Sequence, residues 1–405
     1  MLQQLNDLLQ ENKDWIVEQR RYLHQFPEAS QNEYETSKRI ISILEDFNVD
    51  EIKTGFYQTG VTGLIRGNQP GPTIGLRFDI DALEMEEKTG LPFASKNQGL
   101  MHACGHDGHT AMGLGAALVL MKLKDQFPGN IKLIFQPAEE DGQNGGGAQY
   151  LIKEGVLKDP EVSAILGMHI WPNLAAGKIA TRSGVIMGAS DPFQIDISGQ
   201  GGHASQPHFT VDPIVVGSQI INNLQTIVSR NIDPFDQAVI SVGIFDGGTR
   251  YNTIPDQVTL KGTVRTFNQE VRDKVEARMT EIIEKTAEGL GGRAELNYTR
   301  GYPPVVNDQE LVRLAETTLA GSESLTEVVL AERPAPTGED FAYFARAVPG
   351  LFLWLGANES GESLESPGLH SPYFNFPEEI LLNGIQAVSS IAINWLKNQE
   401  AENGS

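Results

Sequence analysis

The sequence contains a single cysteine, Cys104, among 405 residues. One cysteine cannot form a disulfide within its own chain, and this fits a protein of the reducing cytoplasm. Long apolar runs are also missing, and no stretch approaches the roughly 18 residues of a transmembrane helix. The N-terminal segment 1–21 is polar and lacks the apolar core of a signal peptide. We therefore expect a cytoplasmic protein that does not enter a membrane.

Basic residues are scarce, because 31 Lys and Arg face 53 Asp and Glu and leave a formal net charge of −22. A surface of this charge repels phosphate backbones, so nucleic acid is a poor candidate partner. It attracts cations everywhere and therefore helps a specific metal site only weakly. An anionic substrate would need a local arginine to overcome the field.

Internal repeats and low-complexity segments are absent, and the length exceeds that of one ordinary compact domain, so we expect two domains. Strands that alternate with helices, and polar residues placed after the strands, are typical of an α/β sheet with its ligand crevice at the carboxyl edge of the strands. The strands are expected at 60–66, 73–79, 131–135, 162–168 and 351–355. The helices are expected at 1–20, 33–47, 110–124, 148–154, 311–320 and 380–397.

A second pattern interrupts this alternation after about residue 184. Strands at 190–198, 238–245, 257–266 and 293–299, with helices at 212–230 and 269–290, follow the order β-α-β-β-α-β. This order is typical of a ferredoxin-like split unit. We expect an α/β catalytic domain of residues 1–185 and 299–405, with a central mixed sheet flanked by helices. Residues 186–298 would be an inserted ferredoxin-like α+β domain that serves as lid and dimerisation surface.

The segment 101–111 gathers candidate metal ligands in one place. It holds Cys104 and Asp107 together with His102, His106 and His109, which are three of the eight histidines. Thiolate and imidazole groups between glycines, just ahead of an apolar helix, suit a transition metal. The alternative is a polar loop that caps the helix, although a cap needs only one side chain.

Three further positions extend this set. Glu139 and Glu140 follow a predicted strand, His169 ends another, and His370 lies in a loop bounded by glycine and proline. Taken singly, these residues fit a solvated carboxylate pair, a buried histidine and a loop histidine. Taken together with the loop, they provide about six ligands, the usual inventory of a hydrolase with two divalent ions. Such ions polarise a carbonyl and lower the pKa of water, while a nearby carboxylate moves its proton.

Several segments of the chain also resemble a known family. They are His102-Ala-Cys-Gly-His-Asp-Gly-His109, Gln136-Pro-Ala-Glu-Glu140, Gly167-Met-His169, Gly201-Gly-His-Ala-Ser205, Tyr251-Asn-Thr-Ile-Pro255, Gly338-Glu-Asp-Phe-Ala342 and Leu369-His-Ser-Pro372. In this order they resemble the M20 metallopeptidases, and within them the amidohydrolase branch of hippurate hydrolases, N-acyl-amino-acid deacylases and auxin-conjugate hydrolases. Cys104 indicates this branch, since other branches usually place a carboxylate in the bridging position.

The resemblance implies a role for each matching residue. Cys104 would bridge two metal ions, and Glu139 would be the general base that activates the attacking water and later protonates the leaving nitrogen. Asp81 matches a position that orients a group beside the metal. The implied metal ligands are Cys104, His106, Glu140, His169 and His370.

Some positions of the loop and of the strand before it are less defined by the resemblance. Sister branches carry a histidine ligand where this chain has Asp79, so metal binding by Asp79 stays open. Glu84 stands where the family normally has proline. His102 and His109 are interpreted as supporting or helix-start residues, and Asp107 as an orienting partner.

The inserted domain carries the remaining candidates. In the family, a histidine such as His203 reaches over from the partner subunit and stabilises the tetrahedral oxyanion; the alternative is a surface turn. Asn252 and Arg265 could hold the free carboxylate of a substrate, with the arginine as a bidentate clamp; singly, either fits a surface position.

These observations predict a dinuclear metal-dependent amidohydrolase, with two divalent ions per subunit, that removes the acyl group from an N-acyl amino acid. We expect Mn²⁺ or Zn²⁺, with Ni²⁺ or Co²⁺ as further candidates, and a homodimer whose domains close on the substrate. A dipeptidase or carboxypeptidase on the same site is one alternative. A cysteine-nucleophile amidase that uses Cys104 with His106 is another. A metal-binding protein without turnover is the third, although the base Glu139 would serve no purpose there.

Overall fold

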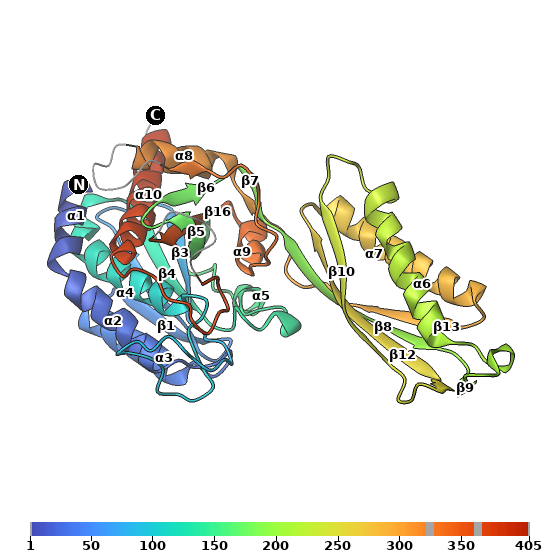
Figure 1. The fold of residues 1–405 in the computed structure, drawn as a ribbon. Coiled ribbons are helices and arrows are strands. Elements are labelled where there is room, and N and C mark those ends of the chain that lie inside the picture. The colour runs from blue at the N-terminus through green and yellow to red at the C-terminus, as the bar shows by residue number, and fades with distance from the viewer. Residues whose placement is uncertain (1, 321–327, 360–366, 404–405) are drawn as a thin grey trace. The chain divides into compact units, whose positions relative to one another are not determined.

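A computed structural model describes residues 2–320, 328–359 and 367–403 of the chain. The chain forms two compact units, which we call unit 1 and unit 2. Unit 1 consists of Met1–Ile186, Val306–Arg333 and Asp340–Ser405, and unit 2 of Met187–Val305 with Pro334–Glu339. The segment 334–339 therefore joins the inserted unit, which sequence patterns did not predict. In Figure 1, β3, β4, β5 and α4 belong to unit 1, and β8, β10, β12 and α6 to unit 2.

Unit 1 contains an eight-stranded mixed sheet in the order β1-β2-β4-β3-β5-β16-β6-β15. Its strands are β1 (Glu51–Phe56), β2 (Gly60–Arg66), β3 (Thr73–Asp79), β4 (Asn130–Gln136), β5 (Val162–Ala175), β6 (Ile179–Thr181), β15 (Val329–Leu330) and β16 (Gly350–Asn358). β3 pairs in parallel with both β4 and β5, and β5 pairs in parallel with β16. The carboxyl ends of these strands therefore meet at one edge of the sheet.

Helices cover the sheet of unit 1. They are α1 (Leu2–Glu11), α2 (Lys13–Gln25), α3 (Tyr34–Asp46), α4 (His106–Leu123), α5 (Ala148–Lys153), α8 (Gln309–Leu319), α9 (Phe341–Ala347) and α10 (Ile380–Asn403). Small and apolar residues cover nearly every side of α4, and the helix packs against β3, α2 and α10. An added methyl group on its Gly113 would lie 2.6 Å from the ring of Phe135. Small residues thus let α4, and the site residues in its first turn, approach the sheet closely.

The mixed α/β class predicted from the sequence is confirmed, with local differences. The helix expected at 1–20 is interrupted at Asn12, whose side-chain amide donates to the carbonyl of Leu8. α4 begins at His106 rather than at 110, because Gly105 adopts a φ of 89° that favours glycine. β1 was not predicted, and β5 continues past His169, which therefore lies within the strand rather than at its end.

Unit 2 has a four-stranded antiparallel sheet in the order β10-β12-β8-β13. Its strands are β8 (Ala189–Ser198), β10 (Ala238–Gly247), β12 (Gln257–Thr266) and β13 (Arg293–Tyr298), and α6 (Pro213–Thr226) and α7 (Gln269–Gly289) pack on it. Asp212 caps α6 and Asn268 caps α7 through their side chains. This strand order is that of the predicted split βαβ unit. The short pair β9 (Gly202–His203) and β11 (Thr253–Ile254) belongs to the same unit.

Two short strands, β7 (Gly184–Met187) and β14 (Val305–Asn307), lie where the chain passes from one unit to the other. Among the described residues, no helix is both long and apolar enough to cross a membrane.

Candidate metal centre

The carboxyl edge of β3, β4 and β5 brings together residues that are far apart in the sequence. Asp79 ends β3 and Asp81 follows it, Glu139 and Glu140 follow β4, and His169 lies in β5. The order β4-β3-β5 makes these three strands direct neighbours. The first turn of α4 and the loop before it add Cys104 and His106 at the same edge, so the predicted ligands converge.

One group of donors consists of Cys104, His106 and His169, whose ligand atoms all lie within 4.8 Å of one another. The Sγ atom of Cys104 is 3.3 Å from Nε2 of His169. Bond lengths near 2.1–2.3 Å at a tetrahedral ion put two donors roughly 3.5 Å apart, so this spacing suits a shared cation. Nδ1 of His169 lies 2.7 Å from the carbonyl oxygen of Ile170 and donates to it, so that Nε2 carries a lone pair directed at Cys104.

A second group consists of Cys104, Glu140 and His370, again within 4.8 Å. Nε2 of His370 is 3.2 Å from Oε1 of Glu140. The two groups share Cys104, which is the geometry that a bridging ligand requires. His370 is held there by its backbone, because its N–H donates to the carbonyl of Ala103 at 2.8 Å.

Nε2 of His106 is buried and has no hydrogen-bond partner among the described residues, which points to a cation. It lies 4.0 Å from Oε1 of Glu140, whose near neighbour is Nε2 of His370. On its other side, Nδ1 of His106 donates to the backbone and side-chain oxygens of Asp81, at 3.0 and 3.1 Å. Asp81 therefore fixes the tautomer of His106 so that Nε2 carries the lone pair when the ring is neutral. A divalent cation would satisfy both atoms, and the donor set of thiolate, imidazole and carboxylate fits one.

Glu139 lies beside these groups. It is 6% exposed, and its carboxylate lies within 4.8 Å of the ligand atoms of His106 and Glu140. Asp81 is fully buried and also accepts from the N–H of Glu140 at 2.9 Å and from the hydroxyl of Ser30 at 2.6 Å. It thereby connects the β3 end to the turn after β4.

The charges of the metal-free centre are unbalanced toward the negative. Burial, together with the nearby charges of Glu140 and Glu139, raises the pKa of the Cys104 thiol well above its usual value. Burial alone would lower the pKa of His106, yet Asp79, Asp81 and Glu140 raise it to about 10. Both groups thus keep protons that two divalent cations would displace.

Asp79 takes part in a different network. Its carboxylate accepts from Nδ1 of His109 at 2.5 Å and from Arg77 at 2.6 Å. His109 uses its second nitrogen to accept from the N–H of Ile170 at 2.9 Å. These two residues therefore offer a cation fewer uncommitted lone pairs than the two groups around Cys104, although Asp79, His106 and His109 lie within 4.8 Å of one another.

His102 and Asp107 belong to the same segment but to none of the donor groups. Both ring nitrogens of His102 are buried without a hydrogen-bond partner in the described part of the chain, and burial lowers its pKa to about 4. Asp107 accepts from Arg20 and from His24, each at 2.9 Å. The pair Arg20–Asp107 is almost fully buried, so the first turn of α4 is anchored to α2.

The candidates in unit 2 occupy two places within that unit. His203 is exposed in β9, its Nδ1 accepts from the hydroxyl of Ser205 at 2.8 Å, and the carbonyl of Asn252 accepts from the N–H of Ala204 at 3.1 Å. Arg265 lies near the far end of β12, roughly 26 Å along the strand from its first residue, Gln257, at the usual rise of a strand. Its guanidinium donates to the carbonyl of Pro336 at 3.0 Å. Asn252 and Arg265 therefore do not converge within one copy of unit 2.

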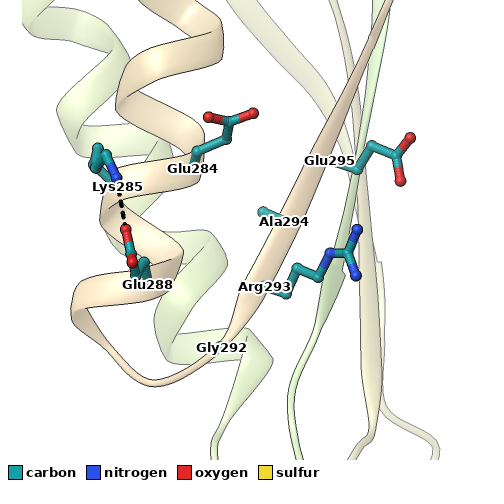
Figure 2. Close-up of a pocket in the computed structure, with 7 residues that line it drawn as sticks. All are labelled: Glu284, Lys285, Glu288, Gly292, Arg293, Ala294 and Glu295. Atoms are coloured by element: carbon teal, nitrogen blue, oxygen red, sulfur yellow. Dashed lines mark hydrogen bonds and ion pairs between the residues drawn. The ribbon is translucent and has the colours of Figure 1, made fainter.

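Two surface hollows differ in their relation to the centre. One of about 390 Å³ adjoins Glu140 and is lined by Ala29, Ser30, Asn32, Ala82, Leu83, Glu84, Glu140 and Asp141. Another of about 560 Å³ lies on unit 2 between α7 and β13 (Figure 2) and contains none of the predicted site residues. Lys285 in that hollow already pairs with Glu288 at 2.8 Å. The first hollow is thus the one that borders the candidate centre.

Comparisons with known proteins place the chain among metallopeptidases and deacetylases. Residues 75–394 match the family described as Peptidase family M20/M25/M40. The chain is 41% identical over 383 residues to an N-acetyl-L-cysteine deacetylase of Bacillus subtilis, covering 94% of this chain and 88% of that protein. It is 39% identical over 396 residues to thermostable carboxypeptidase 1 of Saccharolobus solfataricus, covering 98% and 99%.

A solved structure from Bacillus subtilis, described as a dinuclear metal binding peptidase from the M20 family, has the same fold. It superimposes with a TM-score of 0.82 at 38% identity, over 96% of this chain and 99% of that one.

Sequence patterns did not predict three sets of contacts near the centre. They are the bond of Glu33 to Ala138, the bond of Ser30 to Asp81, and the pair Asp79–His109. Glu33 bonds to the backbone of Ala138, 105 residues away. No local pattern around residue 33 indicates such a partner, since the bond joins the residue before α3 to the turn after β4.

Proposed function

The chain belongs to peptidase family M20/M25/M40, and from this membership we propose that it is a dinuclear metal-dependent hydrolase that cleaves the amide bond of N-acyl amino acids. The family consists of hydrolases that act on amide bonds, and the amidohydrolase branch matches this chain. The observation that carries the proposal is that two donor groups share Cys104. N-acetyl or N-benzoyl amino acids are the proposed substrates, and they are cleaved to a carboxylate and a free amino acid.

Each residue of the centre has a proposed task. Cys104 would bridge the two ions, His106 and His169 would complete one site, and Glu140 and His370 the other. Two divalent cations would supply Lewis-acid polarisation of the scissile carbonyl and a lowered pKa for the attacking water. Mn²⁺ and Zn²⁺ suit the mixed donor set, with Ni²⁺ and Co²⁺ as further candidates.

Glu139 is proposed as the proton carrier. Its carboxylate would take the proton of the attacking water and pass it to the leaving nitrogen, so that the amine departs neutral. Asp81 would act through His106, whose ring it orients. Glu139→Gln should therefore lower kcat by about 10²–10⁴-fold and leave KM and metal content nearly unchanged. Turnover near the wild-type rate in this variant would contradict the assignment of the base.

A carboxypeptidase or dipeptidase activity is the second candidate, and the 39% identity to a thermostable carboxypeptidase favours it. A peptide bond and an N-acyl bond present the same carbonyl and nitrogen to the centre. The two candidates are distinguished by measuring kcat/KM for a panel of N-acetyl amino acids, N-benzoyl amino acids and dipeptides with each metal. The proposal predicts that the N-acyl compounds have the higher kcat/KM, and a preference for dipeptides would favour the second candidate.

The environment of Cys104 argues against a mechanism in which its thiol is the nucleophile. A nucleophilic cysteine needs a lowered pKa, whereas burial, Glu140 and Glu139 raise the pKa of this thiol. Exhaustive EDTA should abolish activity, and Mn²⁺ or Zn²⁺ should restore it. Activity that survives EDTA would favour the thiol mechanism. A metal-storage role without turnover would leave the buried carboxylate of Glu139 without a task.

We also propose a homodimer in which His203 of one copy reaches the centre of the other and stabilises the oxyanion. The outer strand β10 of unit 2 supports this proposal, because Val239, Ile244 and Phe245 on it are exposed apolar residues. Asn252 lies beside His203 and would enter with it, while Arg265 would bind the substrate carboxylate from a separate position. A cytoplasmic location stays a prediction that rests on the single cysteine.

A further inference from the structure

The turn that carries Glu139 contains a residue in an unfavourable backbone conformation. Ala138 has a φ of 57° and a fully buried side chain. An L-residue other than glycine adopts this left-handed region reluctantly, because its Cβ crowds the following carbonyl oxygen. Such a conformation persists only where surrounding contacts hold it. The contacts to Ala138 therefore determine the direction in which the next residue, Glu139, projects.

Glu33 makes one of these contacts. Its Oε1 accepts from the N–H of Ala138 at 2.9 Å, and the carbonyl of Ala138 accepts from the N–H of Gly147 at 2.9 Å. The same Oε1 also accepts from the N–H of Gln31 at 3.0 Å, and Gln31 is left-handed as well, with a φ of 65°. One buried carboxylate oxygen thus holds two residues in conformations that they would not adopt by themselves.

Glu33 does not serve its own helix with this carboxylate. It stands directly before α3, where a side chain commonly caps the helix, but it makes no such bond. Glu28 does so instead, accepting from the N–H groups of Glu35 and Thr36 at 3.1 and 2.8 Å. The second oxygen of Glu33 accepts from the hydroxyl of Thr59 at 2.7 Å. The carboxylate of Glu33 therefore bonds to Ala138, Gln31 and Thr59 and to no N–H of α3.

Neighbours of Glu33 hold the same turn. The side-chain amide of Gln31 donates to Asp141 at 2.6 Å. The hydroxyl of Ser30 donates to Asp81 at 2.6 Å, and Asp81 accepts from the N–H of Glu140. We call residues 30–33 the brace. The brace contacts the turn on both sides of Glu139. In the described part of the chain, Glu33 makes the brace's only hydrogen bond to Ala138.

We propose that Glu33 is a positioning residue for Glu139, which it aims at the centre by holding Ala138 in its left-handed conformation. The inference rests on the general-base role proposed above for Glu139. Glu33 itself touches neither substrate nor metal. Misplacing a reacting group by about 1 Å can cost about 10²-fold in rate, so the loss of this bond should be visible in kcat.

The test compares Glu33→Ala with Glu33→Gln in the metal-loaded enzyme. The substrate is the N-acyl amino acid that the wild type turns over fastest, and metal per chain is measured by elemental analysis. Glu33→Ala should lose at least tenfold in kcat, keep KM within about twofold and keep its metal. Glu33→Gln should recover most of kcat, because its amide oxygen can still accept from Ala138 and Gln31 while its amide group faces the hydroxyl of Thr59.

Glu28→Ala is the matched control. It removes a carboxylate that accepts backbone N–H groups in the same segment but makes no bond to the turn. It should lower the thermal midpoint and leave kcat unchanged. A kcat of Glu33→Ala within twofold of wild type would overturn the inference. A loss of metal in proportion to the loss of activity would also overturn it, because Glu33 would then support metal binding rather than Glu139.

A second pair of variants leaves Glu33 intact. Ala138→Gly tolerates a positive φ and should keep kcat, whereas Ala138→Val disfavours it more than alanine and should lose kcat with its metal retained. Equal kcat in the two variants would overturn the inference. Glu139→Gln measured alongside separates the two proposals. If it is inactive while Glu33→Ala is normal, only the positioning role fails; if it is active, the proposed base fails.

Discussion

At the scale of single residues, Cys104 is the side chain that the two donor groups share. It is 6% exposed, belongs to both donor groups, and lies 3.3 Å from Nε2 of His169. No other described residue belongs to those two groups together. A change at this position would therefore affect both proposed metal positions at once.

We expect Cys104→Ala to lower the bound metal from two ions per chain and to reduce turnover by at least 10²-fold. The fold should survive, since the change removes only one buried sulfur atom. In the wild type, metal at 100 times its Kd should add about 2.7 kcal/mol to the free energy of unfolding, and the variant should lose most of this gain. Elemental analysis and thermal unfolding with and without Mn²⁺ provide the measurement. Two ions retained in the variant would contradict the bridging role.

Glu33 is also expected to make the stability of the metal-free chain depend on pH. Burial and the charge of Asp81 raise the pKa of its carboxyl to about 7, although the hydrogen bond from Thr59 lowers it in part. The unfolded chain has a pKa of about 4.3. Between these two values the folded chain holds more protons than the unfolded chain, so the free energy of unfolding falls as pH rises.

Glu33→Gln cannot titrate and should remove this dependence. The stability of the variant relative to wild type should increase from about pH 4.5 to pH 7 and then stay constant, by an amount on the order of 1 kcal/mol or more. Urea unfolding of both metal-free proteins at pH 5 and pH 8 measures the difference. An equal difference at the two pH values would show that Glu33 has the same pKa in both states.

At the scale of elements, α2 holds the first turn of α4 in place through a buried ion pair. Arg20 donates to Asp107 at 2.9 Å, and the two side chains are 1% and 0% exposed. Burial alone would raise the pKa of Asp107, but Arg20 and His24 keep it far below its usual value. Since Asp107 directly follows His106, the pair fixes the helix end that carries a predicted ligand.

Arg20→Met should therefore destabilise the metal-free chain by about 3 kcal/mol, because it removes the guanidinium from the buried charge of Asp107 and leaves only His24 beside it. Arg21→Met is the matched control: Arg21 is half exposed, and its ion pair with Glu378 should contribute no more than about 1 kcal/mol. Urea unfolding gives both values. A similar decrease in the free energy of unfolding in the two variants would mean that the buried ion pair stabilises the chain no more than the exposed one.

At the scale of the whole molecule, the two units divide the predicted catalytic groups between them. The donors and Glu139 belong to unit 1, while His203, Asn252 and Arg265 belong to unit 2. In the proposed homodimer, a complete site takes Glu139 from one copy and His203 from the other. Activity would then depend on association of the chains.

This arrangement predicts that two inactive variants restore each other. Glu139→Gln and His203→Ala, mixed and allowed to exchange subunits, should form heterodimers in which one of two sites is intact, giving roughly a quarter of wild-type activity at random pairing. Each variant alone is the control. No recovery after verified exchange would contradict the role of His203 in the partner's site, as would full activity of a monomer measured by light scattering.

Local chemistry and periodicity account for what could be predicted. The bounds of β3 and β12 follow from their apolar patterns, and the α/β class follows from the order of elements. The family follows from short segments with fixed spacing. Predictions were less accurate where a single residue decides, as at Asn12, which ends α1, and at Gly105, whose positive φ starts α4 early.

The sequence by itself determined the inventory of the candidate centre: one thiol, three imidazoles and the carboxylates of Glu139 and Glu140, all at predicted strand ends or in loops. Only the tertiary structure decided which of them meet. The order β4-β3-β5 lets two donor groups share Cys104, commits Asp79 to His109 and Arg77, and brings Glu33 to Ala138. The physical reason is that strand order and helix packing are set by contacts between distant segments, whereas spacing along the chain records only local preference.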